Sequence, residues 1–289
     1  MNKKIIYVLI PFIIFLLAGV AYFSLKLEKQ KIAWGILEEE IKKELNNFSG
    51  EAGIAIKDLN TGRRIMINPD KLFPSASLVK IPIMLACFYA ANEGKIQLEE
   101  ILKLKATHKV LGSGILKDAS DGAQFTIKQL IELMISESDN TATNMLIDRL
   151  GFACLNDNFK KIGLKDTNIS RRMMDFRSRK AGKENFTTAS DLAHILEKIY
   201  KKKLINKAYS QMCLDFLKKQ KIKDRIPVKL PAGTLVAHKT GLEKGICHDA
   251  GIVFTPRGDF LICVLTRHKN KTAKSAKELI AQLAFLTYS

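Results

Sequence analysis

Three short segments, far apart in the chain, carry the residue types of an acyl-transfer site: Ser77-Leu78-Val79-Lys80, Ser138-Asp139-Asn140 and Lys239-Thr240-Gly241. A serine hydroxyl is a poor nucleophile at neutral pH and needs a base within hydrogen-bond reach. A lysine one helical turn later can supply that base. Ser77 is the only serine in the chain with a lysine three positions further on, so we predict Ser77 as the nucleophile and Lys80 as its base.

The other two segments supply the groups that such a site still lacks. Ser138 adds a hydroxyl and Asn140 an amide, and Lys239 adds a positive charge. Gly241 leaves room for a substrate backbone beside a strand. The separations between the segments are 61 residues from Ser77 to Ser138 and 101 residues from Ser138 to Lys239.

These motifs and their spacing resemble those of the penicillin-recognising serine enzymes, most closely the class A β-lactamase family, over roughly residues 50 to 287. The resemblance implies that Ser138 relays a proton to the departing lactam nitrogen. It also implies that Asn140 hydrogen-bonds Lys80 and the substrate, and that the backbone N–H groups of Ser77 and Leu242 form an oxyanion hole.

Substrate contacts follow from the same resemblance. We expect Lys239 to attract a substrate carboxylate, and Thr240 and Gly241 to lie along the substrate. Arg225 stands fourteen residues before Lys239, where some members of the family place a carboxylate-binding arginine. A surface arginine without a role in binding is the alternative for that position.

One position departs from the family pattern. A class A β-lactamase carries an Arg-x-Glu stretch whose glutamate activates the water that releases the acyl-enzyme. Counting along this chain places Arg171 on the arginine and Met173 on the glutamate, and the nearest carboxylate is Asp175. Because a thioether cannot act as a general base, either Asp175 takes the role or deacylation is slow. A purely structural aspartate is the third alternative.

Three functions are therefore open. The first is a serine β-lactamase-like hydrolase that opens β-lactam amides through an acyl-enzyme. The second is a penicillin-binding D-alanyl-D-alanine peptidase or transpeptidase with slow deacylation, and the third is a non-catalytic module that binds the cell envelope. We expect a monomer and no cofactor. We also expect no metal site, because Cys247, His248 and Asp249 with His238 match no standard ligand spacing.

The elements that position these motifs follow from the pattern of apolar residues. Apolar residues that recur about every 3.6 positions predict a helix over residues 31–48. Apolar and polar residues then alternate on both sides of an Asn60-Thr61-Gly62 turn, which predicts a β-hairpin from residue 52 to residue 68. Capping pairs predict helices in the middle of the chain. Three further strands are predicted over residues 234–239, 250–254 and 260–266, and a last helix over residues 273–286.

Strands at both ends of the chain with helices between them predict an α/β fold: one antiparallel sheet flanked by N- and C-terminal helices, with an inserted all-α domain. The sheet lobe is predicted over residues 31–68 and 231–289, and the all-α lobe over residues 69–230. The first 25 residues are expected to be a signal peptide or membrane anchor, because an almost wholly apolar run from Ile5 to Leu25 follows Lys3 and Lys4. We therefore predict export across the cytoplasmic membrane, with the domain anchored outside or secreted after cleavage.

The net charge of +18 first suggests nucleic-acid binding. The lysines are spread along helices without an aromatic-interleaved patch, so we expect no nucleic acid and a solvated lysine-rich surface. Five cysteines, an odd number, leave at least one without an intramolecular partner.

Overall fold

The computed structural model describes residues 3–289, without the side chains of residues 3–15, 18, 21, 26 and 27. It divides into two units, residues 1–44 and residues 45–289. The first unit is helix α1, Lys3–Asn46, which continues into the first residues of the second. The predicted anchor falls mostly on side chains outside the described ones. Among the described residues, no helix combines the length and the apolar character needed to cross a membrane.

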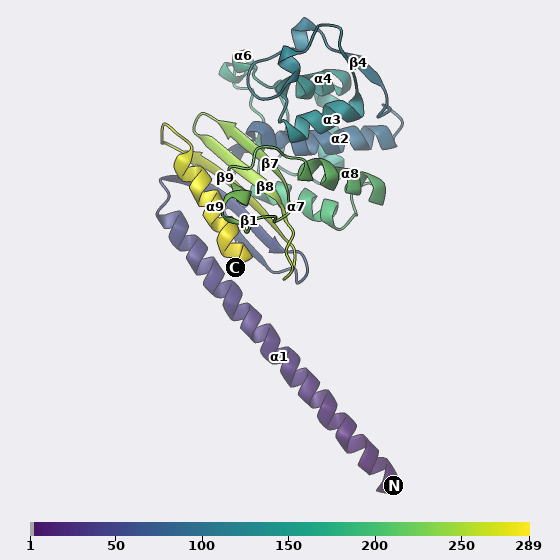
Figure 1. Ribbon diagram of the computed structural model, residues 1–289, viewed down its shortest axis with the longest axis vertical. Helices are drawn as coiled ribbons and strands as arrows, with labels where there is room; N and C mark the ends of the chain where they lie inside the picture. Colours follow the sequence, from purple (N-terminus) through teal and green to yellow (C-terminus); the bar gives the residue numbers. More distant parts are fainter. Residues whose placement is uncertain (1–2) are drawn as a thin grey trace. The chain divides into compact units, whose positions relative to one another are not determined.

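A five-stranded antiparallel sheet forms the centre of the second unit (Figure 1), in the order β2-β1-β9-β8-β7. Its strands are β1 (Gly50–Asp58), β2 (Arg64–Ile67), β7 (Val236–Glu243), β8 (Ile246–Val253) and β9 (Phe260–His268). Strand β1, from the start of the unit, pairs with β9, from its end. The two chain ends therefore build one sheet, as the sequence predicts.

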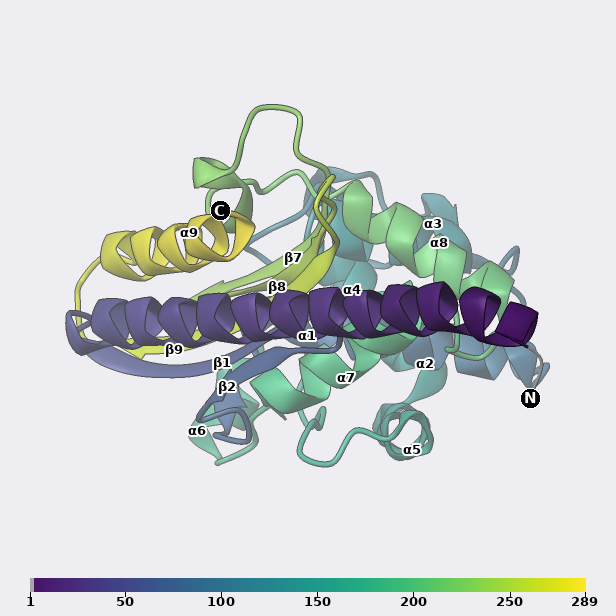
Figure 2. The ribbon, with the colours of Figure 1, turned by 90° about the horizontal axis from the view of Figure 1, so that it is seen from below.

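Alternation along the strands gives the sheet two apolar faces. On β9, Leu261, Cys263 and Leu265 belong to the large core that also contains residues of the helical part, whereas Ile262 and Val264 are buried outside that core. Figure 2 shows α9 (Lys274–Tyr288) and α7 (Ala189–Tyr200) on opposite sides of the sheet. The predicted fold class is thus confirmed for residues 45–289.

The helical part lies between β2 and β7 in sequence. Its helices, besides α7, are α2 (Lys80–Asn92), α3 (Ile127–Ser136), α4 (Asn140–Leu150), α5 (Phe152–Ile162), α6 (Phe176–Lys180) and α8 (Lys207–Lys218). Two small pairs of strands, β3 (Phe73–Pro74) with β6 (Phe186–Thr187) and β4 (Ile101–Lys103) with β5 (Gln124–Thr126), join them.

Helix caps form where the sequence predicts them. Thr126 and Gln129 form a reciprocal capping box at α3, and Thr188 caps α7 through the N–H of Asp191. Helix α7 belongs to the stretch predicted as all-α, yet it contacts β1, β8 and β9. One helix from the middle of the chain therefore covers the sheet.

One strand differs from expectation. The sequence predicts a strand over residues 234–239, but β7 continues to Glu243 because Glu243 still pairs with Ile246 of β8. The turn follows at Gly245, whose φ of 73° suits glycine. All five cysteine thiols are free in the described part of the chain.

Candidate active site

Ser77 lies in the short 3-10 helix η1, Ala76–Val79, which leads directly into α2. Its side chain is half-buried, and its hydroxyl makes no hydrogen bond to any residue within 3–289. The loop before it is fixed: the N–H of Ser75 donates to the Asn185 carbonyl at 2.8 Å. The hydroxyl is therefore free to attack, on a segment that is held in place.

His248 of β8 supports the same loop. Its Nε2 lies 2.9 Å from the Pro74 carbonyl, and its Nδ1 accepts from the Thr266 N–H at 2.9 Å. Burial lowers the pKa of His248 to about 4. A neutral ring with its proton on Nε2 satisfies both partners, so His248 is structural and not a metal ligand or base.

Lys80 is fully buried one helical turn after Ser77. Its Nζ donates to the Ser138 carbonyl at 2.6 Å, the Asn140 Oδ1 at 2.8 Å and the Ser138 Oγ at 3.2 Å. Burial, and then the charge of Lys239, hold the pKa of Lys80 well below its ordinary value of 10.5, against the opposing effect of Asp139. A lysine that loses its proton more easily can take one from a serine.

Ser138 joins the two lysines. It lies in the turn between α3 and α4, with a positive φ of 54° that is uncommon for a residue with a side chain. Its Oγ accepts from Lys80 at 3.2 Å and from Lys239 at 2.9 Å. A hydroxyl has two lone pairs and one hydrogen. With both lone pairs occupied, the Ser138 hydrogen is free to be donated to another group.

Asp139 holds this turn in its unusual conformation. Its carboxylate accepts three backbone N–H bonds, from Ile115 at 2.7 Å, Leu116 at 2.8 Å and Ala142 at 2.8 Å. Gly114 packs so closely that a Cβ added to it would lie 2.3 Å from the Asp139 carboxyl carbon. These contacts make Asp139 a structural residue.

Lys239 reaches the same hydroxyl from the edge strand β7. It is fully buried, and desolvation lowers its pKa to about 7. Asp249 opposes this shift and Arg225 adds to it. Lys239 therefore carries a charge that a substrate carboxylate would stabilise and that is lost as the pH rises through about 7.

Gly241 brings β7 against the nucleophile segment. A Cβ at Gly241 would lie 3.3 Å from the Ala76 Cβ and 3.4 Å from the His248 Cβ, a contact tighter than side chains normally make. Thr240 beside it is buried, and the Leu242 side chain is half exposed. Strand β7 is at the edge of the sheet, so its outer side is free to face a substrate beside Ser77.

Arg225 is 1% exposed, so the alternative of a surface arginine is wrong. Its Nη1 contacts Asp224 Oδ1 at 2.8 Å and its Nε contacts the Cys247 Sγ at 3.2 Å. Its charge acts on Lys239. Arg225 thus adds to the positive potential at Lys239, which would help to stabilise a bound anion.

His238 contacts Asp249 on the neighbouring strand at 2.9 Å through its Nδ1. Asp249 also accepts from the Ile226 N–H at 3.2 Å. The described residues contain no group of three or more His, Cys, Asp or Glu side chains arranged to hold a metal ion. This pair therefore joins β7, β8 and the segment after Arg225.

Met173 occupies an apolar position. Its side chain is 5% exposed and belongs to the main core. Asn144 of α4 fixes its backbone from both sides, accepting from the Met173 N–H at 2.8 Å and donating to its carbonyl at 3.2 Å. No sequence pattern singled out Asn144, which lies one helical turn after Asn140 on the same face of α4.

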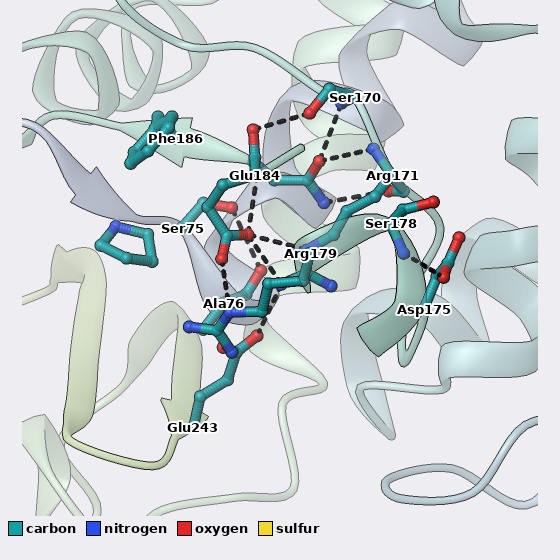
Figure 3. A network of polar contacts seen from close by, with 12 residues as sticks. Ser75, Ala76, Ser170, Arg171, Asp175, Ser178, Arg179, Glu184, Phe186 and Glu243 are labelled. Atoms are coloured by element: carbon teal, nitrogen blue, oxygen red, sulfur yellow. Dashed lines mark hydrogen bonds and ion pairs between the residues drawn. The ribbon is translucent and has the colours of Figure 1, made fainter. Parts of the chain in front are cut away.

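Asp175 is the N-cap of α6, and its carboxylate accepts from the Ser178 N–H at 2.9 Å (Figure 3). These bonds hold the pKa of Asp175 below its ordinary value. Within residues 3–289, Asp175 makes no hydrogen bond or ion pair to Ser77, Lys80 or Ser138. Its geometry fits the structural alternative, and its role as a base gains no support.

Known proteins resemble this chain in sequence and in fold. The sequence model that describes the β-lactamase enzyme family matches residues 36–289. The chain belongs to the β-lactamase enzyme family. Extended-spectrum β-lactamase PER-1 of Pseudomonas aeruginosa is 25% identical over 88% of this chain and 86% of its own length. The predicted class of enzyme, a serine hydrolase of the β-lactamase type, is confirmed.

Solved structures of the family give the same picture. An acyl-enzyme complex of a single-residue mutant of PBP-A with penicillin G has a TM-score of 0.81 and 31% identity, covering 88% of this chain and 95% of that one. A β-lactamase from Sphaerobacter thermophilus has a TM-score of 0.76 and 32% identity, covering 82% and 89%. Solved structures that resemble this chain therefore include a protein named as a β-lactamase and PBP-A, which was captured as an acyl-enzyme with penicillin G.

Proposed function

We propose that this protein is a serine hydrolase that opens β-lactam amides through an acyl-enzyme on Ser77 and releases the acyl group slowly. The observation that carries this proposal is the Ser138 hydroxyl, which accepts hydrogen bonds from both Lys80 and Lys239. This arrangement supplies a base, a proton relay and a cation beside one free serine hydroxyl.

Acylation follows from these contacts. The Ser77 Oγ attacks the carbonyl carbon, and its proton passes to a neutral Lys80 Nζ. A neutral Lys80 Nζ has two hydrogens, enough for its two shorter bonds, to the Ser138 carbonyl and Asn140, and its lone pair takes the Ser77 proton. The proton gained restores the longest bond, to the Ser138 Oγ. Ser138 then gives its proton to the ring nitrogen as the amide bond breaks, and takes the proton held by Lys80.

The substrate is held from the strand side. Lys239, with Arg225 behind it, attracts the carboxylate of a β-lactam. We propose that the backbone N–H groups of Ser77 and Leu242 stabilise the oxyanion, an interaction generally worth several kcal/mol. Asn140 and Thr240 complete the contacts to the substrate.

Release of the acyl group needs a base that activates water. Met173 has no proton acceptor of the required strength, and Asp175 is engaged in capping α6. We therefore expect the acyl-enzyme to accumulate.

Purified protein mixed with a labelled penicillin tests this proposal, with the covalent adduct followed by mass spectrometry and the released product followed over time. We expect an adduct with one penicillin per chain, followed by slow turnover, and neither in Ser77→Ala. No adduct with several β-lactams would remove the enzyme proposal and leave the non-catalytic envelope-binding module.

A second candidate substrate is a D-alanyl-D-alanine peptide of the cell wall, with β-lactams acting as slow inhibitors. Met173 favours it, because a thioether in place of a base leaves a β-lactam bound to the serine. Turnover of such a peptide by the wild type, lost in Ser77→Ala and exceeding penicillin turnover, would select this candidate.

From the sequence we further propose export across the cytoplasmic membrane and action as a monomer, with residues 1–25 as a membrane anchor or a cleaved signal peptide. The apolar run from Ile5 to Leu25 supports the proposal. Fractionation of cells that express the full chain, followed by sequencing of its N-terminus, distinguishes an anchored from a cleaved form.

A further inference from the structure

Four charged side chains connect the end of β7 to the loop formed by residues 171–184 (Figure 3). Arg171, Arg179 and Glu184 belong to the loop, and Glu243 is the last residue of the strand. We call this group the Glu243 cluster. Two arginines and two glutamates make its formal charge zero, so each carboxylate has a counter-charge.

Glu184 joins the two arginines within the loop. Its Oε1 lies 2.7 Å from Arg171 Nη2, and its Oε2 lies 2.8 Å from Arg179 Nε. These pairs close the loop on itself, but they do not attach it to the sheet.

Glu243 makes that attachment. Its Oε2 lies 2.8 Å from Arg179 Nη1, and its Oε1 lies 3.4 Å from Arg171 Nη2. The side chains of Glu243 and Arg171 are 18% and 3% exposed. The pair with Arg171 is therefore screened less than a surface pair, whereas Arg179 is 33% exposed; removing Glu243 leaves the buried Arg171 charge with Glu184 alone in the cluster.

The attachment lies next to the proposed oxyanion donor on the strand side and leads to Met173 on the loop side. Leu242, whose N–H is the proposed oxyanion donor, directly precedes Glu243. Strand β7 is at the sheet edge, so this end has hydrogen-bonded support from β8 alone. On the other side, the loop carries Met173, which Asn144 fixes to α4.

We infer that Glu243 is a positioning residue for acylation: by pairing with Arg171 and Arg179, it holds the Leu242 N–H at a fixed place relative to the 171–184 loop and Ser77. This inference rests on the proposed function, because it assigns Glu243 to the acylation step. Glu243 itself does not touch the reacting atoms.

The test is Glu243→Gln in the full chain, which keeps the size of the side chain and removes its charge. We expect the limiting rate constant of acylation by a penicillin to fall by about tenfold to a hundredfold. The dissociation constant of the first, non-covalent complex should change little, because Lys239 and Arg225 remain. Amide hydrogen exchange within residues 171–184 should become faster.

Glu100→Gln is the matched control. It breaks another arginine–glutamate pair, with Arg149, in which Glu100 Oε2 lies 2.9 Å from Nη2. We expect no change in acylation there. Should Glu243→Gln fail to fold, Arg179→Gln removes the more exposed partner and should slow acylation in the same direction.

Acylation of Glu243→Gln at the wild-type rate would overturn the inference, whatever the exchange shows. If the wild type itself forms no adduct, the proposed function fails instead. Hydrogen exchange compares the two chains without a substrate, so unchanged exchange in Glu243→Gln would then overturn the attachment separately.

Discussion

Replacing Lys239 with glutamine should move the pH dependence of acylation to higher pH. Lys80 acts as a base only when neutral, so acylation increases as the pH rises through the pKa of Lys80. The charge of Lys239 is one of the two causes that lower this pKa. Without that charge the pKa of Lys80 rises, and a higher pH is needed to reach the same neutral fraction.

The size of the shift follows from the geometry. The two lysine nitrogens lie 3.2 and 2.9 Å from one oxygen, Ser138 Oγ, so they are at most the sum of these distances, about 6.1 Å, apart. At that separation two unit charges repel by about 0.7 kcal/mol in water and about 2.7 kcal/mol at an effective dielectric constant of 20. One pKa unit corresponds to about 1.36 kcal/mol, so the expected shift is roughly 0.5 to 2 units.

The pH profile of the wild type should also have a falling limb at higher pH, and this limb should disappear in Lys239→Gln. Desolvation sets the pKa of Lys239 to about 7, so the wild-type lysine loses its charge, and its attraction for the substrate carboxylate, as the pH rises through this value. The second-order rate constant of acylation reports these pKa values in the free enzyme. Since the lysines interact, the values belong to the pair.

The assay is that rate constant measured with a penicillin from about pH 5 to about pH 10, for the wild type and Lys239→Gln. Glutamine will also reduce the rate itself, but the position of the rising limb does not depend on that. Lys95→Gln is the control, because Lys95 is an exposed lysine paired with Glu93. A rising limb that stays in place or moves to lower pH would refute the coupling of the two lysines.

Three other substitutions test separate parts of the account. Met173→Glu should accelerate release of the acyl group by about a hundredfold to ten-thousandfold, the usual contribution of a general base, whereas Met173→Gln should not; equal release rates in both would remove this position from deacylation. Asp175→Asn should leave deacylation unchanged, because Asp175 caps α6; a large loss would make it the base. Asp139→Asn should lower the free energy of unfolding by about 1 to 3 kcal/mol in a denaturant titration, because an amide cannot accept all three backbone bonds. Its control, Asp157→Asn at an exposed site, should have little effect, and similar values for the two would contradict the structural role of Asp139.

The sequence predicted the groups that react better than the groups that hold them. Ser77, Lys80, Ser138 and Lys239 are recognisable because their chemistry restricts residue type and spacing, and the structure brings the last three together. The strands were predictable from alternation, although the end of β7 was not, because Glu243 breaks the apolar pattern while its backbone still pairs with β8.

The supporting residues were hidden for a physical reason. Asn144, His248 and Glu243 act through contacts with residues 29, 174 and up to 72 positions away. Such contacts leave no local pattern, since an asparagine in a helix or a glutamate after a glycine motif is common on any surface. The same holds for Arg225. It is buried against Cys247 of β8, and the residues next to Arg225 in the sequence do not indicate that contact.

The measurement that tests the central claim most directly is the mass of the intact protein after mixing with a penicillin, in the wild type and in Ser77→Ala. The account predicts one covalent penicillin on the wild type that persists well beyond the mixing time, located on the peptide that contains Ser77, and none on Ser77→Ala. An adduct of the same mass on Ser77→Ala, or an unmodified wild type, would contradict it.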